Sequence, residues 1–131
     1  MTFTRKALSQ LGGFDERLGA GTFFCSGEDT DLLRRASLAG LRGEYVPMIK
    51  VAHHHGRRDT NAVARLKRGY ERGIGACLAK LLLNRDGRAL YLQHGYWLLR
   101  EAGVLRAVRI LFFGMLFVLR YRTYEWSVDG Q

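Results

Sequence analysis

The chain is organised around the stretch Gly27-Glu28-Asp29-Thr30-Asp31-Leu32-Leu33-Arg34-Arg35, in which three carboxylates fall within four positions. Apolar residues recur behind these acids at helical spacing, so we expect an amphipathic helix that starts near Glu28, with Ser26 as its N-cap, and that Gly40 terminates. The free backbone N–H groups and the helix dipole stabilise ionised carboxylates in a first turn. Such a fixed carboxylate can serve as a general base. Acids are also common in first turns because they stabilise the helix, so both interpretations stay open on these residues alone.

Short motifs on both sides of this stretch narrow the choice. Gly12-Gly13-Phe14-Asp15-Glu16 lies upstream, and Tyr45-Val46-Pro47 and Val51-Ala52-His53 lie downstream. In this order, and around a Glu-Asp-x-Asp-Leu helix start, they resemble the second half of a family 2 inverting glycosyltransferase with the GT-A fold. The resemblance covers residues 3–60 well and residues 68–80 loosely. It implies an α/β fold, here the C-terminal part of a GT-A domain.

The resemblance also implies roles for individual acids. Asp29, the second acid of the Glu-Asp pair, would remove the proton from the acceptor hydroxyl, and Glu28 would orient the acceptor or support that role. Asp15, Glu16 and Asp31 would contribute to the acceptor-binding site. The implied reaction is a single displacement at the anomeric carbon of a nucleotide-activated sugar, with inversion, onto a glycan or lipid-linked acceptor.

Metal and diphosphate binding is expected to depend mainly on residues outside this chain. In the family, an Asp-x-Asp pair in a preceding nucleotide-binding half holds a divalent cation, Mn²⁺ or Mg²⁺, and no such pair precedes Phe14 here. The resemblance implies that His53 adds a metal ligand from this side. Arg57 and Arg58 would approach the diphosphate, or they form a solvated charge pair. We therefore expect the acceptor-side half of a transferase, a fragment or one part of an assembly, inactive without the nucleotide-binding half.

Two regions of different character are expected along the chain. Residues 1–60 form the acceptor-side half, with a helix from Thr4 to Leu11, Phe14 in the apolar interior, and short strands at residues 43–46 and 49–53. Residues 61–131 form a mostly helical tail with twelve basic and five acidic residues, which holds most of the net charge of +9. Helices are expected up to about Leu83, then over residues 88–102 and 103–121.

The first tail helix contains small residues on one side. Gly69, Gly73 and Ala76 share one side of it, which predicts the close approach of another element or a hinge, because a glycine inside a helix is otherwise unfavourable. Cys25 and Cys77 form no Cys-x-x-Cys motif, so we expect reduced thiols in a cytoplasmic protein rather than a zinc or redox centre.

The last helix is apolar all round from Ile110 to Leu119. These ten residues cover about half of a ~30 Å hydrocarbon core, and arginines flank them, so a spanning helix is disfavoured. We expect residues 103–122 to lie on a membrane surface, at the inner face of the cell membrane, or to pack against another protein part or a second copy. A non-catalytic membrane-surface or partner-binding module is the alternative function. Nucleic-acid binding is not expected, because apolar side chains interleave with the arginines and no such motif is present.

Overall fold

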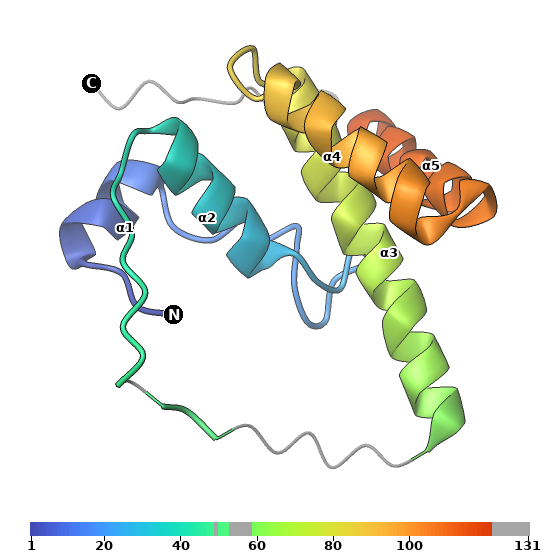
Figure 1. Cartoon of the computed structure of the whole chain (residues 1–131), viewed down its shortest axis with the longest axis horizontal. Helices are drawn as coiled ribbons and strands as arrows, with labels where there is room; N and C mark the ends of the chain where they lie inside the picture. Colours follow the sequence, from blue (N-terminus) through green and yellow to red (C-terminus); the bar gives the residue numbers. More distant parts are fainter. Residues whose placement is uncertain (49, 53–58, 122–131) are drawn as a thin grey trace.

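The structure is a computed structural model that describes residues 1–48, 50–52 and 59–121. Within these ranges it has five α-helices: α1 Arg5–Leu11, α2 Glu28–Leu38, α3 Thr60–Leu83, α4 Arg88–Ala102 and α5 Val104–Arg120. The long helix α3 is the central element, because α5 packs along it, α4 contacts both of these helices, and α2 contacts α3 and α1 (Figure 1). The three predicted tail helices are confirmed to within one or two residues.

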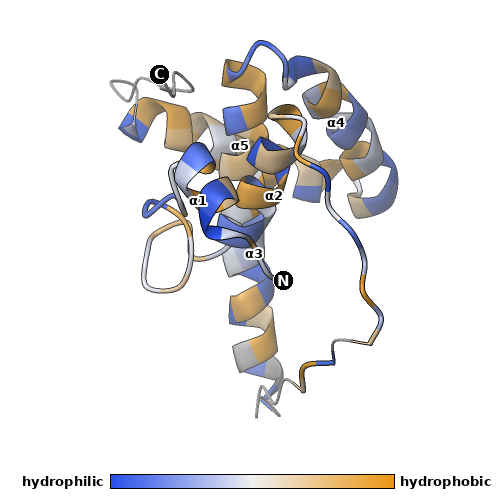
Figure 2. Ribbon diagram, turned by 90° about the vertical axis from the view of Figure 1, so that its left-hand side faces the viewer, coloured by the Kyte–Doolittle hydropathy of each residue, from blue (hydrophilic) through white to orange (hydrophobic). Residues whose placement is uncertain are grey.

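The predicted α/β fold is wrong for the described residues, which contain no strand and no sheet. Residues 43–46 and 50–52, where strands were expected, are irregular, and Tyr45 and Val51 are 88% and 84% exposed. Figures 1 and 2 both show this segment running away from the helices. A strand is held by hydrogen bonds to a neighbouring strand, and no described segment lies beside this one to supply them.

The first helix begins and ends as its sequence predicts. The Thr4 hydroxyl accepts a hydrogen bond from the Ala7 backbone N–H at 3.2 Å, which caps the start of α1. Gly12 follows the helix with φ 72°, a left-handed conformation that glycine adopts without strain. The Gly12-Gly13 pair therefore turns the chain sharply into the Phe14-Asp15-Glu16 loop.

The predicted Ser26 cap of α2 is wrong. The N-cap is Gly27, with φ 98° and no side-chain cap hydrogen bond. A Cβ atom at Gly27 would lie 2.8 Å from the Cys77 sulfur of α3, so the close approach of the two segments requires glycine at this position. The Ser26 hydroxyl instead donates to the Gly69 carbonyl of α3 at 3.4 Å.

The C-terminal end of α2 confirms the prediction for Gly40. This residue follows the cap Ala39 with φ 70°, and its N–H donates to the Ser37 carbonyl at 3.0 Å. The Leu41 N–H donates to the Ala36 carbonyl at 2.9 Å, which completes a Schellman motif.

Small residues allow α3 to approach its neighbours closely on two sides. A Cβ atom at Gly75 would lie 2.3 Å from the Ile110 carbonyl oxygen, and one at Gly114 would lie 2.8 Å from the Gly75 oxygen, so α3 and α5 meet backbone to backbone. On another side, a Cβ atom at Gly73 would lie 2.2 Å from the Ser26 carbonyl oxygen. The predicted close approach is therefore confirmed, and the approaching element is the loop before α2.

The apolar core joins the N-terminal region to the tail. Phe24 is fully buried and meets the ring of Phe117 edge to face, with centroids 5.1 Å apart. Leu18 and the α3 residues Ala76, Cys77 and Ala79 complete this cluster. The prediction that Phe14 plugs the interior is wrong, since that side chain is 51% exposed and Phe24 occupies the core instead.

Among the residues that the structure describes, no helix has both the length and the apolar character that crossing a bilayer requires.

Candidate functional site

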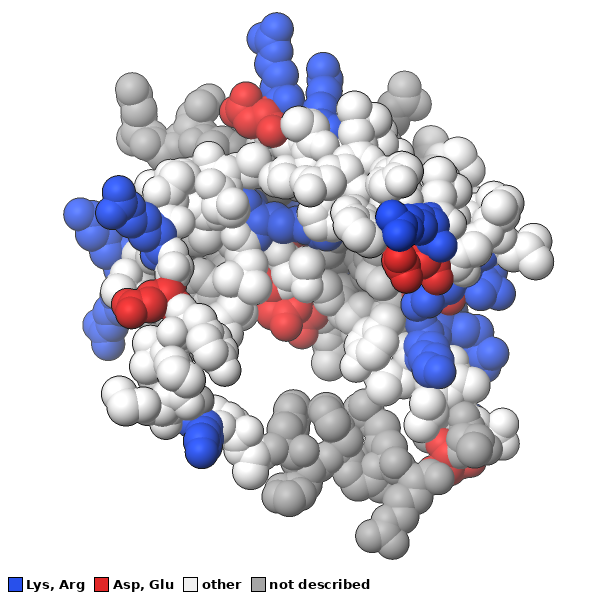
Figure 3. All heavy atoms as spheres, in the orientation of Figure 1, with Lys and Arg blue, Asp and Glu red and all other residues white. Residues whose placement is uncertain are grey.

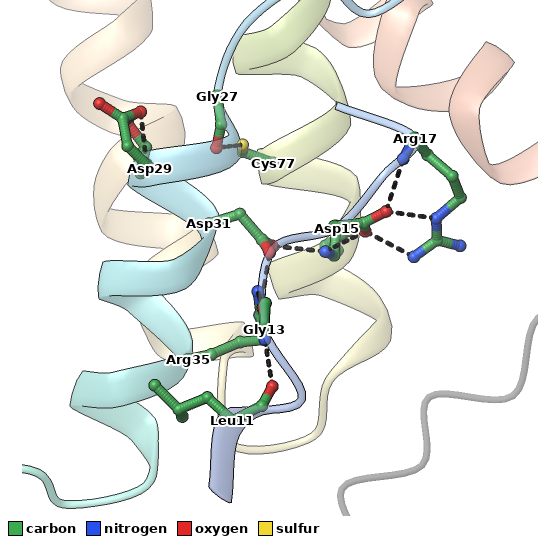
Figure 4. Close-up of polar contacts among 11 residues, drawn as sticks. Leu11, Gly13, Asp15, Arg17, Gly27, Asp29, Asp31, Arg35 and Cys77 are labelled. Atoms are coloured by element: carbon green, nitrogen blue, oxygen red, sulfur yellow. Dashed lines mark hydrogen bonds and ion pairs between the residues drawn. The ribbon is translucent and has the colours of Figure 1, made fainter. Parts of the chain in front are cut away.

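Five charged side chains from three parts of the chain form one buried group, which we call the ion cluster: Asp15, Arg17, Asp31, Arg35 and Lys80 (Figure 4). Lys80 on α3 stands between the two carboxylates. Its Nζ lies 2.5 Å from Asp15 Oδ2 and 2.6 Å from Asp31 Oδ1. The side chains of all three are less than 10% exposed. Removing charges from water is unfavourable unless they are paired, so each member needs the others in place.

The arginines complete the pairing on either side of Lys80. Arg17 donates to both Asp15 oxygens, with Nε–Oδ1 at 2.7 Å and Nη2–Oδ2 at 2.6 Å, and the Arg35 Nε donates to Asp31 Oδ2 at 2.9 Å. Burial raises the pKa of Asp15, but the hydrogen bonds from Arg17 and Lys80 outweigh burial and hold that pKa well below its ordinary value. Asp15 is therefore ionised at neutral pH.

Arg35 also fixes the loop that follows α1. Its Nη1 donates to the Leu11 carbonyl, and its Nη2 donates to the Gly13 carbonyl at 2.7 Å. One planar guanidinium thus binds a carboxylate of its own helix and two backbone oxygens of the Gly-Gly turn. The Gly-Gly-Phe-Asp-Glu loop and the Glu-Asp-x-Asp helix start, which are separate motifs in the sequence, are consequently held in one arrangement.

Asp29 lies outside this cluster. The residue is exposed, and Figure 4 shows its carboxylate pointing away from Asp15 and Asp31. Its Oδ1 accepts hydrogen bonds from the Thr30 N–H at 2.7 Å and from the Thr30 hydroxyl at 3.3 Å. Within the described residues it forms no ion pair with a basic side chain, Arg34 and Arg35 included. Asp29 is thus a solvent-accessible carboxylate on the first turn of a rigidly held helix.

The surroundings of Asp29 are acidic and rich in glycine. Glu28 is half-buried and lies against the loop that precedes α2, where a Cβ atom at Gly19 would come within 3.1 Å of the Glu28 carboxyl carbon. Glu16 is exposed. In Figure 3, acidic side chains face the viewer near the N-terminal end of α2, whereas most basic side chains lie towards the edges of this view. An acceptor with several hydroxyl groups would find hydrogen-bond acceptors here.

The structure therefore separates the predicted site acids into two groups. Glu28 and Asp29 stand together at the start of α2, whereas Asp15 and Asp31 are in the ion cluster, and a direct contact of those two with an acceptor stays a prediction. The predicted metal ligand His53 and the predicted diphosphate ligands Arg57 and Arg58 lie outside the described residues. In the part of the chain that the structure describes, no three His, Cys, Asp or Glu side chains gather as a metal site would require.

Sequence reasoning missed Lys80 as a member of the site. The signal was present, because Lys80 interrupts an otherwise apolar run over residues 76–83, and a lysine at such a position is almost never buried without a partner. A buried acid on the same helix was missed in the same way. Glu71 on α3 binds Arg106 and Arg109 of α5 at 3.1 and 3.2 Å, which ties the two helices together.

Comparisons with known proteins agree with a glycosyltransferase for part of the chain. No protein-family model matches the chain, and no solved structure matches it. The chain is similar to N-acetylglucosaminyl-diphospho-decaprenol L-rhamnosyltransferase of Mycobacterium tuberculosis, with 46% identity over 50 residues in strains CDC 1551 / Oshkosh and ATCC 25618 / H37Rv. The matched segment covers 38% of this chain and 15% of each relative. The chain thus spans a small part of the length of these enzymes.

Proposed function

We propose that this chain supplies the acceptor-side wall of a glycosyltransferase active site, in which Asp29 is the general base. The observation that carries the proposal is the position of Asp29, an exposed carboxylate on a helix start that the ion cluster holds against the Gly-Gly loop. The 46% identity to a rhamnosyltransferase over 50 residues supports the same class of reaction.

The chemistry requires one proton transfer from this chain. The acceptor hydroxyl attacks the anomeric carbon of a nucleotide-activated sugar, and Asp29 takes its proton as the new C–O bond forms. The bond to the nucleotide diphosphate breaks on the opposite side, so the anomeric centre inverts. Glu28, beside Asp29, accepts a hydrogen bond from another acceptor hydroxyl and orients the nucleophile.

In this proposal, Asp15 and Asp31 position the parts of the site and do not take part in the proton transfer. Their oxygens are engaged by Lys80 and the arginines, so they set the angle between α2 and the Phe14-Asp15-Glu16 loop. Glu16, exposed on that loop, is the acid of this motif that an acceptor meets from solvent. The divalent cation stays a prediction.

The relatives suggest which substrates to test first. They are named as L-rhamnosyltransferases that act on N-acetylglucosaminyl-diphospho-decaprenol. We therefore propose a nucleotide-activated L-rhamnose as donor and a polyprenyl-diphosphate-linked sugar as acceptor. Both the donor and the acceptor class are taken from the relatives' names.

The test is sugar transfer by the protein together with the nucleotide-binding half of the site, because the acceptor-side half is expected to be inactive without it. Asp29→Asn keeps the size of the side chain and removes the base, so the transfer rate should fall by about 10²- to 10⁴-fold. Asp86→Asn, at an exposed acid in the turn between α3 and α4, is the matched control and should transfer at the wild-type rate. Wild-type transfer by Asp29→Asn would remove the base assignment.

A second candidate function is a non-catalytic module that binds a membrane surface. It is favoured by the exposed apolar side of α5, where Leu105 is 84% exposed. The same assay, with the nucleotide-binding half present, separates the two candidates, because a non-catalytic module supports no sugar transfer in either the wild-type or the control protein.

A further inference from the structure

One side of α5 is apolar and is not covered by any other described part of the chain. Ala107, Ile110, Gly114 and Phe117 form its buried side against α3. The opposite side carries seven large apolar side chains at steps of one to four residues, which we call the outer face of α5: Val104, Leu105, Val108, Leu111, Phe112, Met115 and Leu119. These side chains are between 43% and 84% exposed. A continuous apolar strip of this kind on a protein surface marks an interaction site.

The charges that α5 itself carries beside this face have one sign. No acidic residue occurs between Ala102 and Tyr121, whereas Arg109 and Arg120 fall by helical spacing along one edge of the outer face. The Arg109 side chain is 61% exposed even though it reaches Glu71. Apolar side chains bordered by arginines are the composition of helices that lie in a bilayer interface.

The charge pattern favours a lipid surface over a second copy of this chain. If α5 packed against α5 of another copy, arginines would approach arginines, and α5 has no acid to pair with them. An anionic bilayer offers the complementary charge at the rim and an apolar layer beneath it. The 17 residues of α5 would extend for roughly 25 Å along such a surface.

We propose that the outer face of α5 docks on the surface of an anionic lipid bilayer, with the helix axis in the plane of the interface. The inference deepens the proposed function, on which it rests for its purpose, because a lipid-linked acceptor would be presented at that surface. The apolar side chains enter the boundary between headgroups and acyl chains, and Arg109 and Arg120 meet lipid phosphates.

Vesicle binding tests the proposal without any sugar substrate. The chain is sedimented with vesicles of equal parts phosphatidylglycerol and phosphatidylcholine, and with vesicles of phosphatidylcholine alone. We expect binding to the anionic vesicles that weakens at high salt. Leu105→Gln/Leu119→Gln should bind about tenfold more weakly. Leu33→Gln/Leu83→Gln is the matched control, because these leucines are also exposed but lie on α2 and α3, and it should bind like the wild type. Circular dichroism confirms that all variants are folded.

Three results would overturn the proposal. They are no binding to anionic vesicles, an equal loss in the control variant, and a dimer in light scattering that Leu105→Gln/Leu119→Gln converts to a monomer. Asp29→Asn should bind vesicles like the wild type. Failure of vesicle binding with intact sugar transfer removes only this inference, and undiminished transfer by Asp29→Asn with intact vesicle binding removes only the proposed function.

Discussion

Replacing Lys80 by methionine should destabilise the protein strongly, because this residue separates two buried carboxylates. Both carboxylate oxygens lie within hydrogen-bonding distance of one nitrogen, so they are no more than about 5 Å apart, and at an effective dielectric constant of ~20 their repulsion without the lysine is about 3 kcal/mol. Breaking a buried ion pair by removing one partner typically costs about 3–5 kcal/mol, which agrees with this figure. Domains of this size are stable by only about 5–15 kcal/mol.

Urea unfolding at neutral pH, followed by circular dichroism, measures this effect. Lys80→Met should lose about 3–5 kcal/mol of unfolding free energy, whereas Lys67→Met, an exposed position on the same helix, should change it by less than about 0.5 kcal/mol. Asp31→Asn should cost less in the Lys80→Met protein than in the wild type, because it then also removes the repulsion with Asp15. The reasoning is refuted if Lys80→Met loses less than about 1 kcal/mol, or if the losses of Lys80→Met and Asp31→Asn simply add.

Three further predictions follow from the same contacts. Arg35→Lys keeps the charge, but a lysine cannot reach Asp31 and two backbone carbonyls at once. We expect the free energy of unfolding in urea to fall by about 1–3 kcal/mol and amide exchange in the Gly-Gly loop to become faster. Unchanged amide exchange in that loop would contradict this prediction. Gly75→Ala should lower the melting temperature, because the new Cβ would lie 2.3 Å from the Ile110 carbonyl oxygen. Gly95→Ala should raise the melting temperature, because its Cβ would meet nothing within 4 Å and the change removes a mid-helix glycine. The reverse order of the two melting temperatures would refute the close contact between α3 and α5. Hydrogen bonds and ion pairing outweigh burial and lower the pKa of Asp15 in the folded state. The stabilisation from Asp15 is therefore present above the unfolded pKa of about 3.9 and is lost as pH falls below it. Burial raises the pKa of Cys77 to about 12, so the free energy of unfolding also falls as pH rises above the unfolded thiol pKa of about 8.5. Unfolding followed across the pH range should therefore show a loss at both ends, with the acid loss reduced in Asp15→Asn and the alkaline loss reduced in Cys77→Ala.

The helices could be predicted because their signals are local. Each signal lies within a few residues of the helix that it predicts: the Thr4 cap, the Gly40 stop and the apolar periodicity of the tail. The strands could not, because a strand depends on a partner that a local pattern does not contain, and no described segment pairs with residues 43–46. Ser26 failed as a cap because the helix begins one residue later than expected and the Ser26 hydroxyl donates to the Gly69 carbonyl of α3, 43 positions along the chain.

The candidate site was predictable in part for the same reason. The acids of the Glu-Asp-x-Asp motif and of the Gly-Gly-Phe-Asp-Glu motif could be identified from the resemblance. Their division into an exposed Asp29 and a buried Asp31 follows from helical geometry only once the position of α3 is known. Lys80 lies 65 residues from Asp15, and the sequence shows only that a lysine in an apolar run needs some acid, without showing which one.

The central claim is that Asp29 performs chemistry while Asp31, two residues away, holds the structure. The most direct test measures sugar transfer and urea unfolding on the same preparations of Asp29→Asn and Asp31→Asn. We predict that Asp29→Asn unfolds like the wild type but transfers at least about 10²-fold more slowly, and that Asp31→Asn loses unfolding free energy. Transfer by Asp29→Asn at the wild-type rate, in protein that is folded, would contradict the account.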